Sequence, residues 1–449
     1  MLNKNILYVS IILFVEGFVS LAYQMLYIKQ ITPYVGNSVE VVSWIVGVFL
    51  IALAIGYKVG GRTVPDVAKS LSRNFLIAAT LGGICLSFLF VEAIFNTFSK
   101  VIPPYYLMIL YCFFIVAPTT FVLGQTIPLM TNYIKGSTVS EISGNVLFLS
   151  TVGSFLGAIV TTNVILKYFG VSTTIVVSAS LLLILNILIS DSKKFAIFLF
   201  SLGIYSLYII NNKYEDISYV ATNQYASYEV LRFQKANVKV FKSNQSYSSV
   251  LENNQKYGYI KLIDNVLFKD MNIKDKDILV IGAGGFVISK DNKDNRFTYV
   301  DIDPAIKNIA EKYFLHEDIN GDFIPADGRA YVNTTDKKYD IIMLDAFSSD
   351  KSIPEHLSSV EFFKKLKERM VDEGMLVVNV IGRRNMSDMY TQSTYKTINT
   401  VFPYCFVQSS AYKAKVTNIQ FICNNVKDIG KIYNDNRNNS NSDFGKLYD

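Results

Sequence analysis

The sequence predicts a multi-span α-helical membrane domain, then a small β unit, then a doubly wound α/β domain. Three observations support this fold class. Hydrophobic residues make up 51% of the 449 residues and charged residues only 18%, which is too apolar for an ordinary soluble protein of this size. The apolar excess lies almost wholly before residue 212. The second half instead alternates short apolar strands with helical segments, a pattern typical of parallel sheets covered by helices.

The first domain, residues 1–211, contains six firm apolar stretches and a shorter seventh, against a requirement of about 20 residues for each crossing. The stretches are 7–27, 39–57, 75–95, 105–133, 146–168, 171–190 and 195–210. The fourth stretch is long and is broken at Pro118, so it has room for a further crossing. We therefore predict six to eight spans.

The first predicted span carries a polar stripe. Glu16, Ser20, Tyr23, Gln24 and Tyr27 follow one another at steps of one, three and four residues, so they share one face of a helix. A carboxyl group in hydrocarbon is costly and usually faces a bundle interior or a cavity. Two interpretations stay open, namely a hydrogen-bonded seam between helices, or a pocket for a cationic or amine-bearing substrate that enters from the membrane.

The composition changes at residue 212 to Asn, Lys, Asp and Tyr. Residues 212–268 are predicted to form the small β-rich unit, because YEVLRF and VKVF alternate apolar with polar residues and SNQS supplies a turn. Residues 269–424 form the predicted α/β domain. The Asn-rich tail, 425–449, has too few apolar residues for a core and is expected to be disordered.

Glycine or acid follows four successive strands of the α/β domain. In doubly wound sheets, ligands bind beyond the carboxyl ends of the strands at the point where the strand order reverses, so these residues are expected to converge on one site. An alternative is that the acids only cap helices. The residues at these ends are Gly282, Gly284, Gly285, Asp301, Asp327, Gly328 and Asp345.

The first two of these strands carry a nucleotide-site pattern. DILVIGAGG at 277–285 and FTYVDIDP at 297–304 form a buried strand, a glycine turn and a second strand that ends in acid. Glycines let backbone N–H groups approach a nucleotide, while the acid accepts from ribose hydroxyls. We expect Asp301 to hold the ribose, Asp327 to accept from an adenine amino group, and Asp345 to face the reacting atoms.

Taken together, VIGAGG, VDIDP, ADGRAYV, YDIIMLDAFSSD and GMLVVNV resemble the spermidine synthase family of aminopropyltransferases, whose cores have the S-adenosylmethionine methyltransferase-like Rossmann fold. The resemblance covers residues 277–381. EGFVSLAYQMLY, LAIGYKVGGR and LGQTIPL are similar to a bacterial branch in which such a domain follows a multi-span membrane region. The resemblance implies transfer of an aminopropyl or related group from decarboxylated S-adenosylmethionine, or a relative, to an amine, with release of methylthioadenosine. Asp345 would then serve as base and counter-charge.

The chain departs from the family where the amine is held. Phe286 follows the glycine loop where the family has an acid, and Ser348 replaces a second acid, for which Asp350 is a substitute at a different position. The Tyr-His-Glu run of the family becomes Tyr259 followed by Ile and Lys. His356 follows the predicted base on a lid-like loop, where it contacts substrate or caps a helix. The tentative substrate residues are Tyr259, Asp350, His356 and Glu16.

Two other functions stay open, a methyltransferase that uses S-adenosylmethionine and a non-catalytic membrane sensor or transporter that binds an adenosyl metabolite. The expected partners are a small-molecule or lipid-linked amine and the lipid bilayer, with self-association only by analogy to soluble relatives. No nucleic acid is expected, because the 43 basic and 37 acidic residues are spread without a dense basic block. No metal is expected. Cys85, Cys112, Cys405 and Cys423 lack metal spacing and are interpreted as buried small hydrophobes rather than ligands or disulfides.

Basic residues predict the orientation of the membrane domain. Lys58, Arg62, Lys69 and Arg73 lie near the second connection beside a single acid, so this connection and the N-terminus are expected in the cytoplasm. A complete seventh crossing would place the C-terminal half outside, whereas adenosine-based cofactors are cytosolic. We therefore expect a multi-pass protein of the bacterial inner membrane with a cytoplasmic C-terminal domain, in which the last stretch is re-entrant or interfacial, or the fourth contains two crossings.

Overall fold

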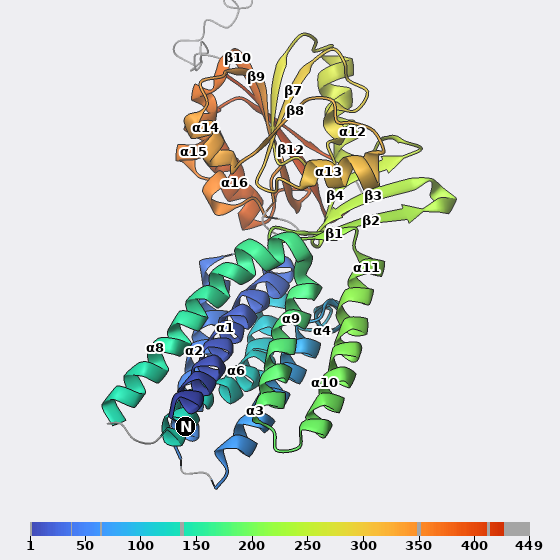
Figure 1. Ribbon diagram of the computed structural model, residues 1–449. Coiled ribbons are helices and arrows are strands. Elements are labelled where there is room, and N and C mark those ends of the chain that lie inside the picture. The colour runs from blue at the N-terminus through green and yellow to red at the C-terminus, as the bar shows by residue number, and fades with distance from the viewer. Residues whose placement is uncertain are drawn as a thin grey trace, which may run out of the picture.

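The computed structural model describes residues 2–36, 38–62, 65–134, 139–347, 352–410 and 414–425. It has two parts. A bundle of long helices forms one end of the molecule, and a domain of strands and helices sits on the other end with a small sheet beside it (Figure 1). The predicted tail beyond Asn425 and the predicted substrate residue Asp350 lie outside the described residues.

The bundle is built from rods that are longer than single regular helices, because short π-helical turns join several of them. Five helices are long and apolar enough to cross a membrane, or up to six if the pair α3 and α4, bent by 59°, is one span. The helices are α1 (Leu2–Val35), α2 (Val39–Gly60), α3 (Val67–Cys85), α4 (Phe88–Phe98), α5 (Pro104–Tyr111), α6 (Ala117–Gly124), α7 (Thr126–Tyr133), α8 (Val139–Val160), α9 (Leu166–Ile189), α10 (Lys193–Tyr208) and α11 (Tyr214–Ser218).

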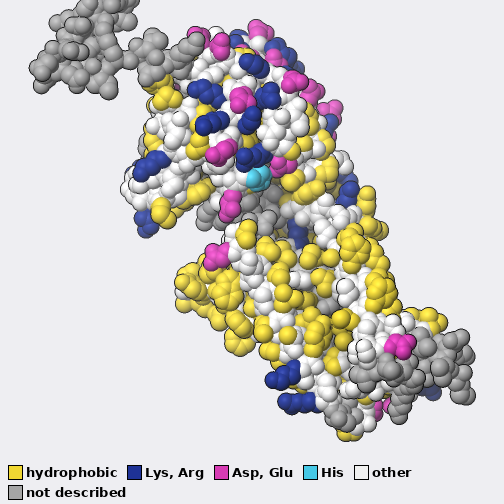
Figure 2. All heavy atoms as spheres, turned by 90° about the vertical axis from the view of Figure 1, so that its left-hand side faces the viewer, with side chains coloured by type: hydrophobic (Ala, Val, Ile, Leu, Met, Phe, Trp, Pro, Cys, Tyr) yellow, Lys and Arg dark blue, Asp and Glu magenta, His cyan; other side chains and the backbone are white. Residues whose placement is uncertain are grey.

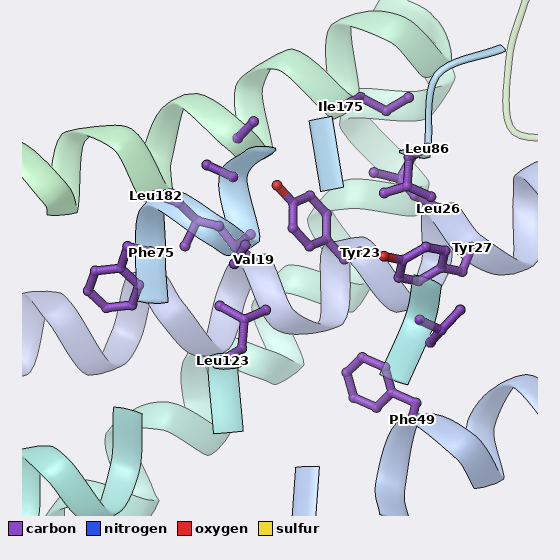
Figure 3. Packing of buried hydrophobic residues seen from close by; sticks show 14 of the residues in the cluster. Val19, Tyr23, Leu26, Tyr27, Phe49, Phe75, Leu86, Leu123, Ile175 and Leu182 are labelled. Atoms are coloured by element: carbon purple, nitrogen blue, oxygen red, sulfur yellow. The ribbon is translucent and has the colours of Figure 1, made fainter. Parts of the chain in front are cut away.

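The centre of the bundle is packed around α1. Tyr23 and Tyr27 of α1 are fully buried and lie among aliphatic side chains from several helices, Ile175 of α9 included (Figure 3). On the face shown in Figure 2, hydrophobic side chains cover much of the bundle below the α/β domain. Apolar side chains both inside and outside the bundle are the pattern of helices surrounded by lipid.

Two sheets follow the bundle, a small antiparallel sheet and a larger sheet that is mostly parallel. The small sheet has the order β1-β2-β3-β4-β5, with every neighbouring pair antiparallel. Its strands are β1 (Ala221–Thr222), β2 (Ser227–Phe233), β3 (Val238–Ser243), β4 (Ser246–Glu252) and β5 (Gln255–Lys256). The helix α12 (Gly258–Asp264) leads from this sheet into the larger domain.

The larger sheet has the order β11-β12-β10-β9-β6-β7-β8 and is parallel except where β12 pairs antiparallel with both neighbours. This is the predicted Rossmann-like arrangement, and the strand order reverses between β6 and β9. The strands are β6 (Asp277–Ile281), β7 (Arg296–Asp301), β8 (Asp322–Pro325), β9 (Tyr339–Leu344), β10 (Met370–Arg383), β11 (Cys405–Ser409) and β12 (Val416–Asn424). The α-helices are α13 (Ile306–Ile309), α14 (Gly328–Thr334), α15 (Val360–Glu368) and α16 (Met389–Asn399).

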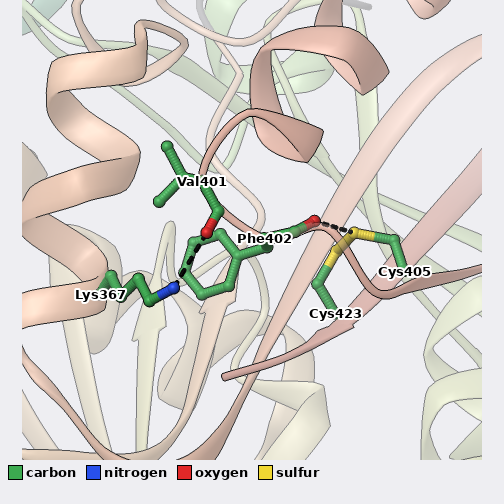
Figure 4. Close-up of a disulfide and its surroundings, with 5 residues drawn as sticks. All are labelled: Lys367, Val401, Phe402, Cys405 and Cys423. Carbon is green, nitrogen blue, oxygen red and sulfur yellow. Dashed lines mark hydrogen bonds between the residues drawn. A yellow bond between two sulfur atoms is a disulfide. The ribbon is translucent and has the colours of Figure 1, made fainter. Parts of the chain in front are cut away.

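A disulfide joins the edge strand β11 to its neighbour β12 (Figure 4). The antiparallel register of β11 and β12 places Cys405 opposite Cys423, and their Cα atoms are 4.0 Å apart. The interpretation of all four cysteines as unpaired hydrophobes was therefore wrong for this pair, because sequence spacing does not report strand register. Cys85 and Cys112 are free and buried, as expected.

We predict that Cys405→Ser/Cys423→Ser lowers the stability of the α/β domain. The disulfide closes a loop with a sequence separation of 18, and loops of this length are stabilised by about 3 kcal/mol. For a domain of this size the melting temperature should fall by about 6 to 12 °C, as measured by resistance to proteolysis after heating. The matched control, Cys85→Ala/Cys112→Ala, keeps the disulfide and should leave the protease resistance of the α/β domain unchanged. Four reactive thiols in the denatured wild type would contradict the pairing.

Candidate active site

A cavity of about 910 Å³ lies beyond the carboxyl ends of β6, β7, β9 and β10. The small sheet forms its opposite wall, with lining residues from the β1 to β2 turn and the β3 to β4 hairpin. Figure 2 shows a hollow between the α/β domain and the helical bundle, with a histidine and acidic side chains near it. The cavity therefore lies where ligands bind to doubly wound sheets, on the side of the domain that faces the bundle.

The glycine turn after β6 forms one edge of the cavity. Gly282 and Gly284 line the cavity, while Gly285 packs against Phe314 and donates its N–H to Ser249 Oγ over 2.9 Å. At Gly282 φ is +94°, and an added Cβ would lie 2.7 Å from the backbone carbonyl carbon of Asp345. Only glycine fits this position.

Asp345 follows β9 at the base of the cavity. Its Oδ2 accepts from Tyr259 Oη over 2.7 Å and its Oδ1 accepts from Asn379 Nδ2 over 2.8 Å. Burial raises the pKa of Asp345 to about 6, although the hydrogen bonds from Asn379 and Tyr259 favour the charged form. Burial and the neighbouring carboxylate together raise the pKa of the Tyr259 hydroxyl well above its ordinary value. Tyr259 therefore stays a donor to an ionisable carboxylate.

Asn379 was not among the predicted site residues. It lies in β10, is 2% exposed, and accepts from Gln420 Nε2 through its own side-chain oxygen over 3.1 Å. Because the side-chain oxygen of Asn379 accepts from Gln420, its NH2 group is the part that faces Asp345 and donates to it. A signal was present in the sequence, because Asn379 is the only polar residue in the apolar run MLVVNVI, and a lone amide in a buried strand needs hydrogen-bond partners.

Asp301 ends β7 beside the glycine turn, as predicted. Its Oδ2 accepts from the N–H of Ala283 over 2.9 Å and its Oδ1 from the N–H of Asp303 over 3.0 Å. Burial raises the pKa of Asp301, while these backbone N–H groups oppose the rise. Asp303, a further acid missed by the predictions, is 2% exposed and accepts from Tyr228 Oη over 2.6 Å and from Asn223 Nδ2 over 2.7 Å. These two bonds tie the small sheet to the cavity.

Asp327 and His356 meet at a third edge of the cavity. Asp327 Oδ2 lies 2.8 Å from His356 Nε2, and its Oδ1 caps α14 by accepting from the N–H of Ala330 over 2.9 Å. Burial tends to raise the pKa of Asp327, but the Ala330 N–H and His356 outweigh this and lower it. Asp327, Gly328 and His356 all line the cavity. Asp327 thus both caps α14 and lines the cavity, whereas the sequence analysis treated these two roles as alternatives.

One predicted substrate residue, Glu16, lies away from the cavity. Glu16 is 2% exposed inside the bundle, where Ser150 Oγ donates to its carboxylate over 3.3 Å, and it does not line the cavity. Phe286 also lies outside the cavity, because its side chain is 1% exposed and packs edge-on against Tyr299 and Phe323.

Carboxyl groups dominate the charge of the cavity. Five acids line it among the described residues, and no Lys or Arg does; the acids are Asp301, Asp303, Asp327, Asp345 and Glu355. Like charges around a shared cavity attract cations and repel anions. The arrangement favours a ligand with positive charge and without an exposed carboxylate or phosphate. The described residues contain no group of three or more His, Cys, Asp or Glu side chains that could hold a metal ion.

Residues 258–427 match the family described as Spermine/spermidine synthase domain. The C-terminal part of the chain is therefore similar to this family. The polyamine aminopropyltransferase of Vibrio vulnificus is 32% identical over 151 residues, which cover 32% of this chain and 49% of that protein. A probable polyamine aminopropyl transferase of Bifidobacterium longum is 32% identical over 128 residues, 28% of each chain. The chain thus spans about half or less of the length of these curated relatives.

Among solved structures, the spermidine synthase of Thermotoga maritima is 16% identical, with a TM-score of 0.38 over 46% of this chain and 71% of that chain. The helical bundle lies outside the residues matched by the spermine/spermidine synthase family.

The buried position of Phe286 predicts that an acid cannot be accommodated at this point of the α/β domain. Phe286→Asp should cost about 3 to 5 kcal/mol from the lost packing, with a further penalty for the buried carboxyl group, and should not increase the turnover of a diamine. Thermal melting and putrescine-dependent product release by the full chain test both statements. Phe286→Leu, which keeps the site apolar, should lose less stability. A gain in putrescine turnover by Phe286→Asp would show that this position faces the substrate.

Proposed function

We propose that the protein is an integral membrane aminopropyltransferase, which moves an aminopropyl group from decarboxylated S-adenosylmethionine to an amine. The observation that carries this proposal is Asp345, an ionisable carboxylate held by Tyr259 and Asn379 in a cavity that no Lys or Arg lines among the described residues. The relatives that match the domain are named as aminopropyltransferases, which supports the same reaction class.

Each residue has a role that its contacts support. Asp345 accepts a proton from the attacking ammonium group, so that the freed nitrogen lone pair forms a bond to the aminopropyl carbon. The bond from this carbon to sulfur breaks, and its electron pair stays on sulfur in neutral methylthioadenosine. The carboxylates of the cavity stabilise the sulfonium and the ammonium in the reactant state and orient them. Asp301 holds the ribose beside the glycine turn, and Tyr259 and Asn379 position Asp345.

The charge of the cavity favours the decarboxylated co-substrate over S-adenosylmethionine itself. An α-carboxylate would enter a cavity that five acids line, and no described basic side chain lines it to offset the repulsion. The decarboxylated form carries only positive charges. This argument also disfavours the methyltransferase, the second candidate function, because that reaction needs the carboxylated co-substrate.

The acceptor is proposed to be an amine with an apolar portion, such as a lipid-linked amine. Tyr225, Tyr247 and Ile302 line the cavity yet are 37%, 64% and 53% exposed, so its mouth has apolar walls. Three residues before Tyr225, Thr222 Oγ accepts from the N–H of Val171 in α9 over 3.1 Å. The mouth of the cavity therefore lies close to the end of the bundle, where an amphiphile can reach it from a bilayer.

The test uses the purified full chain in lipid nanodiscs with decarboxylated S-adenosylmethionine. We expect methylthioadenosine release with a long-chain alkylamine in the nanodisc, and weaker release with putrescine. Release of S-adenosylhomocysteine from S-adenosylmethionine would instead indicate methyl transfer. Tight binding of either co-substrate without any product would indicate a sensor or transporter.

A further inference from the structure

We infer that the bundle crosses the membrane seven times and places the synthase domain on the extracytoplasmic side. This inference rests on membrane insertion of the bundle, which is part of the proposed function. It replaces the cytoplasmic location expected from the sequence, because that expectation required a doubled fourth span or an incomplete last span. The contacts between helices contradict both requirements.

The fourth predicted span is one crossing. Trp44 Nε1, near the start of α2, donates to Tyr105 Oη near the start of α5 over 2.9 Å. At the other end of α2, an added Cβ at Gly60 would lie 2.8 Å from the Cα of Gln125 in the junction of α6 and α7. The segment from α5 to α7 therefore runs parallel to α2 along its length, and Pro118 does not reverse its direction.

The last predicted span is complete. Near its start, Lys193 Nζ donates to the carbonyl oxygen of Leu188 over 2.7 Å, and near its end Asn212 Nδ2 donates to Thr173 Oγ1 over 3.0 Å. It therefore runs antiparallel to α9 for the whole length of that helix. The helical segment Lys193–Ser218 has 26 residues, or about 39 Å at 1.5 Å per residue, against a hydrocarbon thickness of about 30 Å. It is long enough for a full crossing and is not re-entrant.

The segment Ser140–Ile189 contains two crossings. A Cβ added at Gly153 would lie 2.9 Å from the carbonyl carbon of Phe14, and a Cβ added at Gly157 would lie 2.8 Å from the carbonyl carbon of Phe18. Because both contacts advance in the same direction along the two helices, α8 runs parallel to α1. The backbone reverses at Gly170, where φ is +78°, and Figure 1 shows α8 and α9 descending from this turn on either side. The other rods are α1, α2, the bent pair of α3 and α4, the segment from α5 to α7, and the last span from α10 to α11. Together with α8 and α9, the described bundle therefore has seven rods.

The distribution of basic residues orients this seven-rod bundle. Two hydrogen bonds show which helix ends meet at the end of the bundle remote from the synthase domain. Asn186 Nδ2 in α9 donates to the carbonyl of Ser72 in α3, and Tyr8 Oη in α1 donates to the carbonyl of Leu188 in α9. Among the described residues, seven basic residues belong to this end, namely Lys4, Lys58, Arg62, Lys69, Arg73, Lys193 and Lys194. Four belong to the end that carries the domain, namely Lys29, Lys100, Lys167 and Lys213. The remote end is therefore cytoplasmic.

The disulfide is an independent observation with the same implication. Cys405 and Cys423 are paired in the synthase domain, and disulfides persist in oxidising compartments but are rare in the cytosol. Cys85 and Cys112, which lie within the bundle, are free. The only described disulfide is thus found in the part of the chain that the helix directions place outside the cytoplasm.

This location fixes a place in a reaction sequence. The sulfonium of the co-substrate is permanently charged and does not cross a bilayer unaided. An export step, or a source of the adenosyl sulfonium outside the cytoplasm, must therefore precede the transfer.

Cysteine labelling of the full chain in intact bacterial cells tests the orientation. Asp336→Cys places a thiol on the synthase domain at a side chain that is fully exposed, and Ser192→Cys places one at an exposed position between α9 and α10. Both are made with Cys85→Ala/Cys112→Ala, which leaves the disulfide intact. We expect a membrane-impermeant maleimide to label Asp336→Cys in intact cells, and to label Ser192→Cys only after permeabilisation.

The other outcomes overturn the inference. The reverse pattern, or labelling of both variants only after permeabilisation, would place the domain in the cytoplasm. Labelling of both variants in intact cells would show that the rods do not cross as described. Resistance of the protein to carbonate extraction tests membrane insertion separately. Because the transferase assay uses purified protein in nanodiscs open on both faces, its failure is distinguishable from a wrong orientation.

Discussion

Asp345→Asn should abolish transfer while leaving the domain folded. Removal of a general base that also balances positive charge typically costs a factor of about 100 to 10,000 in rate, so methylthioadenosine release should fall by about 1,000-fold. Asn is nearly the same size as Asp and can still accept from Tyr259, so binding of methylthioadenosine by calorimetry should persist. Equal turnover by wild type and Asp345→Asn would remove Asp345 from the mechanism.

The same variant should gain stability relative to the wild type as pH rises, because it lacks the buried ionisable group. Burial raises the pKa of Asp345 from 3.8 to about 6, so the folded state holds the proton more tightly than the unfolded state. Asp345 therefore costs no stability below about pH 3.8; the cost grows as pH rises from about 3.8 to about 6 and is complete above about 6. Fully developed, it is about 3 kcal/mol. Thermal melting should show that the melting temperature of the wild type falls relative to that of Asp345→Asn between pH 5 and pH 7.5.

The pH profile gives a further readout of the same group. Because the base must be ionised, kcat/KM of the wild type should fall as pH decreases through about 6. The positioning variants Asn379→Ala and Tyr259→Phe each remove one hydrogen bond that favours the charged carboxylate. Both should move the acidic limb of the profile to higher pH, a shift that a merely structural role would not produce.

Gly282→Ala is the second large effect, and it should abolish co-substrate binding. The left-handed φ of +94° already strains any residue with a Cβ, and that atom would overlap with the backbone of Asp345. Since Asp345 N–H also donates to the carbonyl of Ile281 over 2.8 Å, the glycine turn and the proposed base cannot separate without breaking the sheet. We expect affinity for methylthioadenosine to fall by at least about 100-fold, and stability by roughly 2 to 4 kcal/mol.

Gly284→Ala is the matched control. Gly284 also lines the cavity and has a left-handed φ of +51°, but the nearest atom to an added Cβ is Ser249 Oγ at 3.3 Å. Gly284→Ala should lower the free energy of unfolding by roughly 1 to 2 kcal/mol, the cost of a left-handed backbone alone. Its affinity for methylthioadenosine should fall only modestly. Equal behaviour of the two variants in calorimetry and melting would show that the contact with Asp345 is not what requires glycine at 282.

The sequence by itself determined the two-part architecture and the strand ends of the site. Apolar length and strand alternation are local properties, so residues such as Asp301 and Asp345 were located before any contact was known. Tertiary structure decided the rest. Asn379, Asp303 and the Cys405 to Cys423 pair depend on which strands are neighbours and in what register.

The direction of each rod of the bundle was also decided only by packing. Hydropathy measures how apolar a segment is and contains no information about whether a chain continues or reverses at a break. The chain continues past Pro118 because α5 to α7 pack along α2. It reverses at Gly170 because Thr222 and Glu215 cap the start of the next rod by accepting from Val171 and Ser172. Those contacts join residues far apart in sequence, so only the folded chain fixes the direction of each rod relative to the α/β domain.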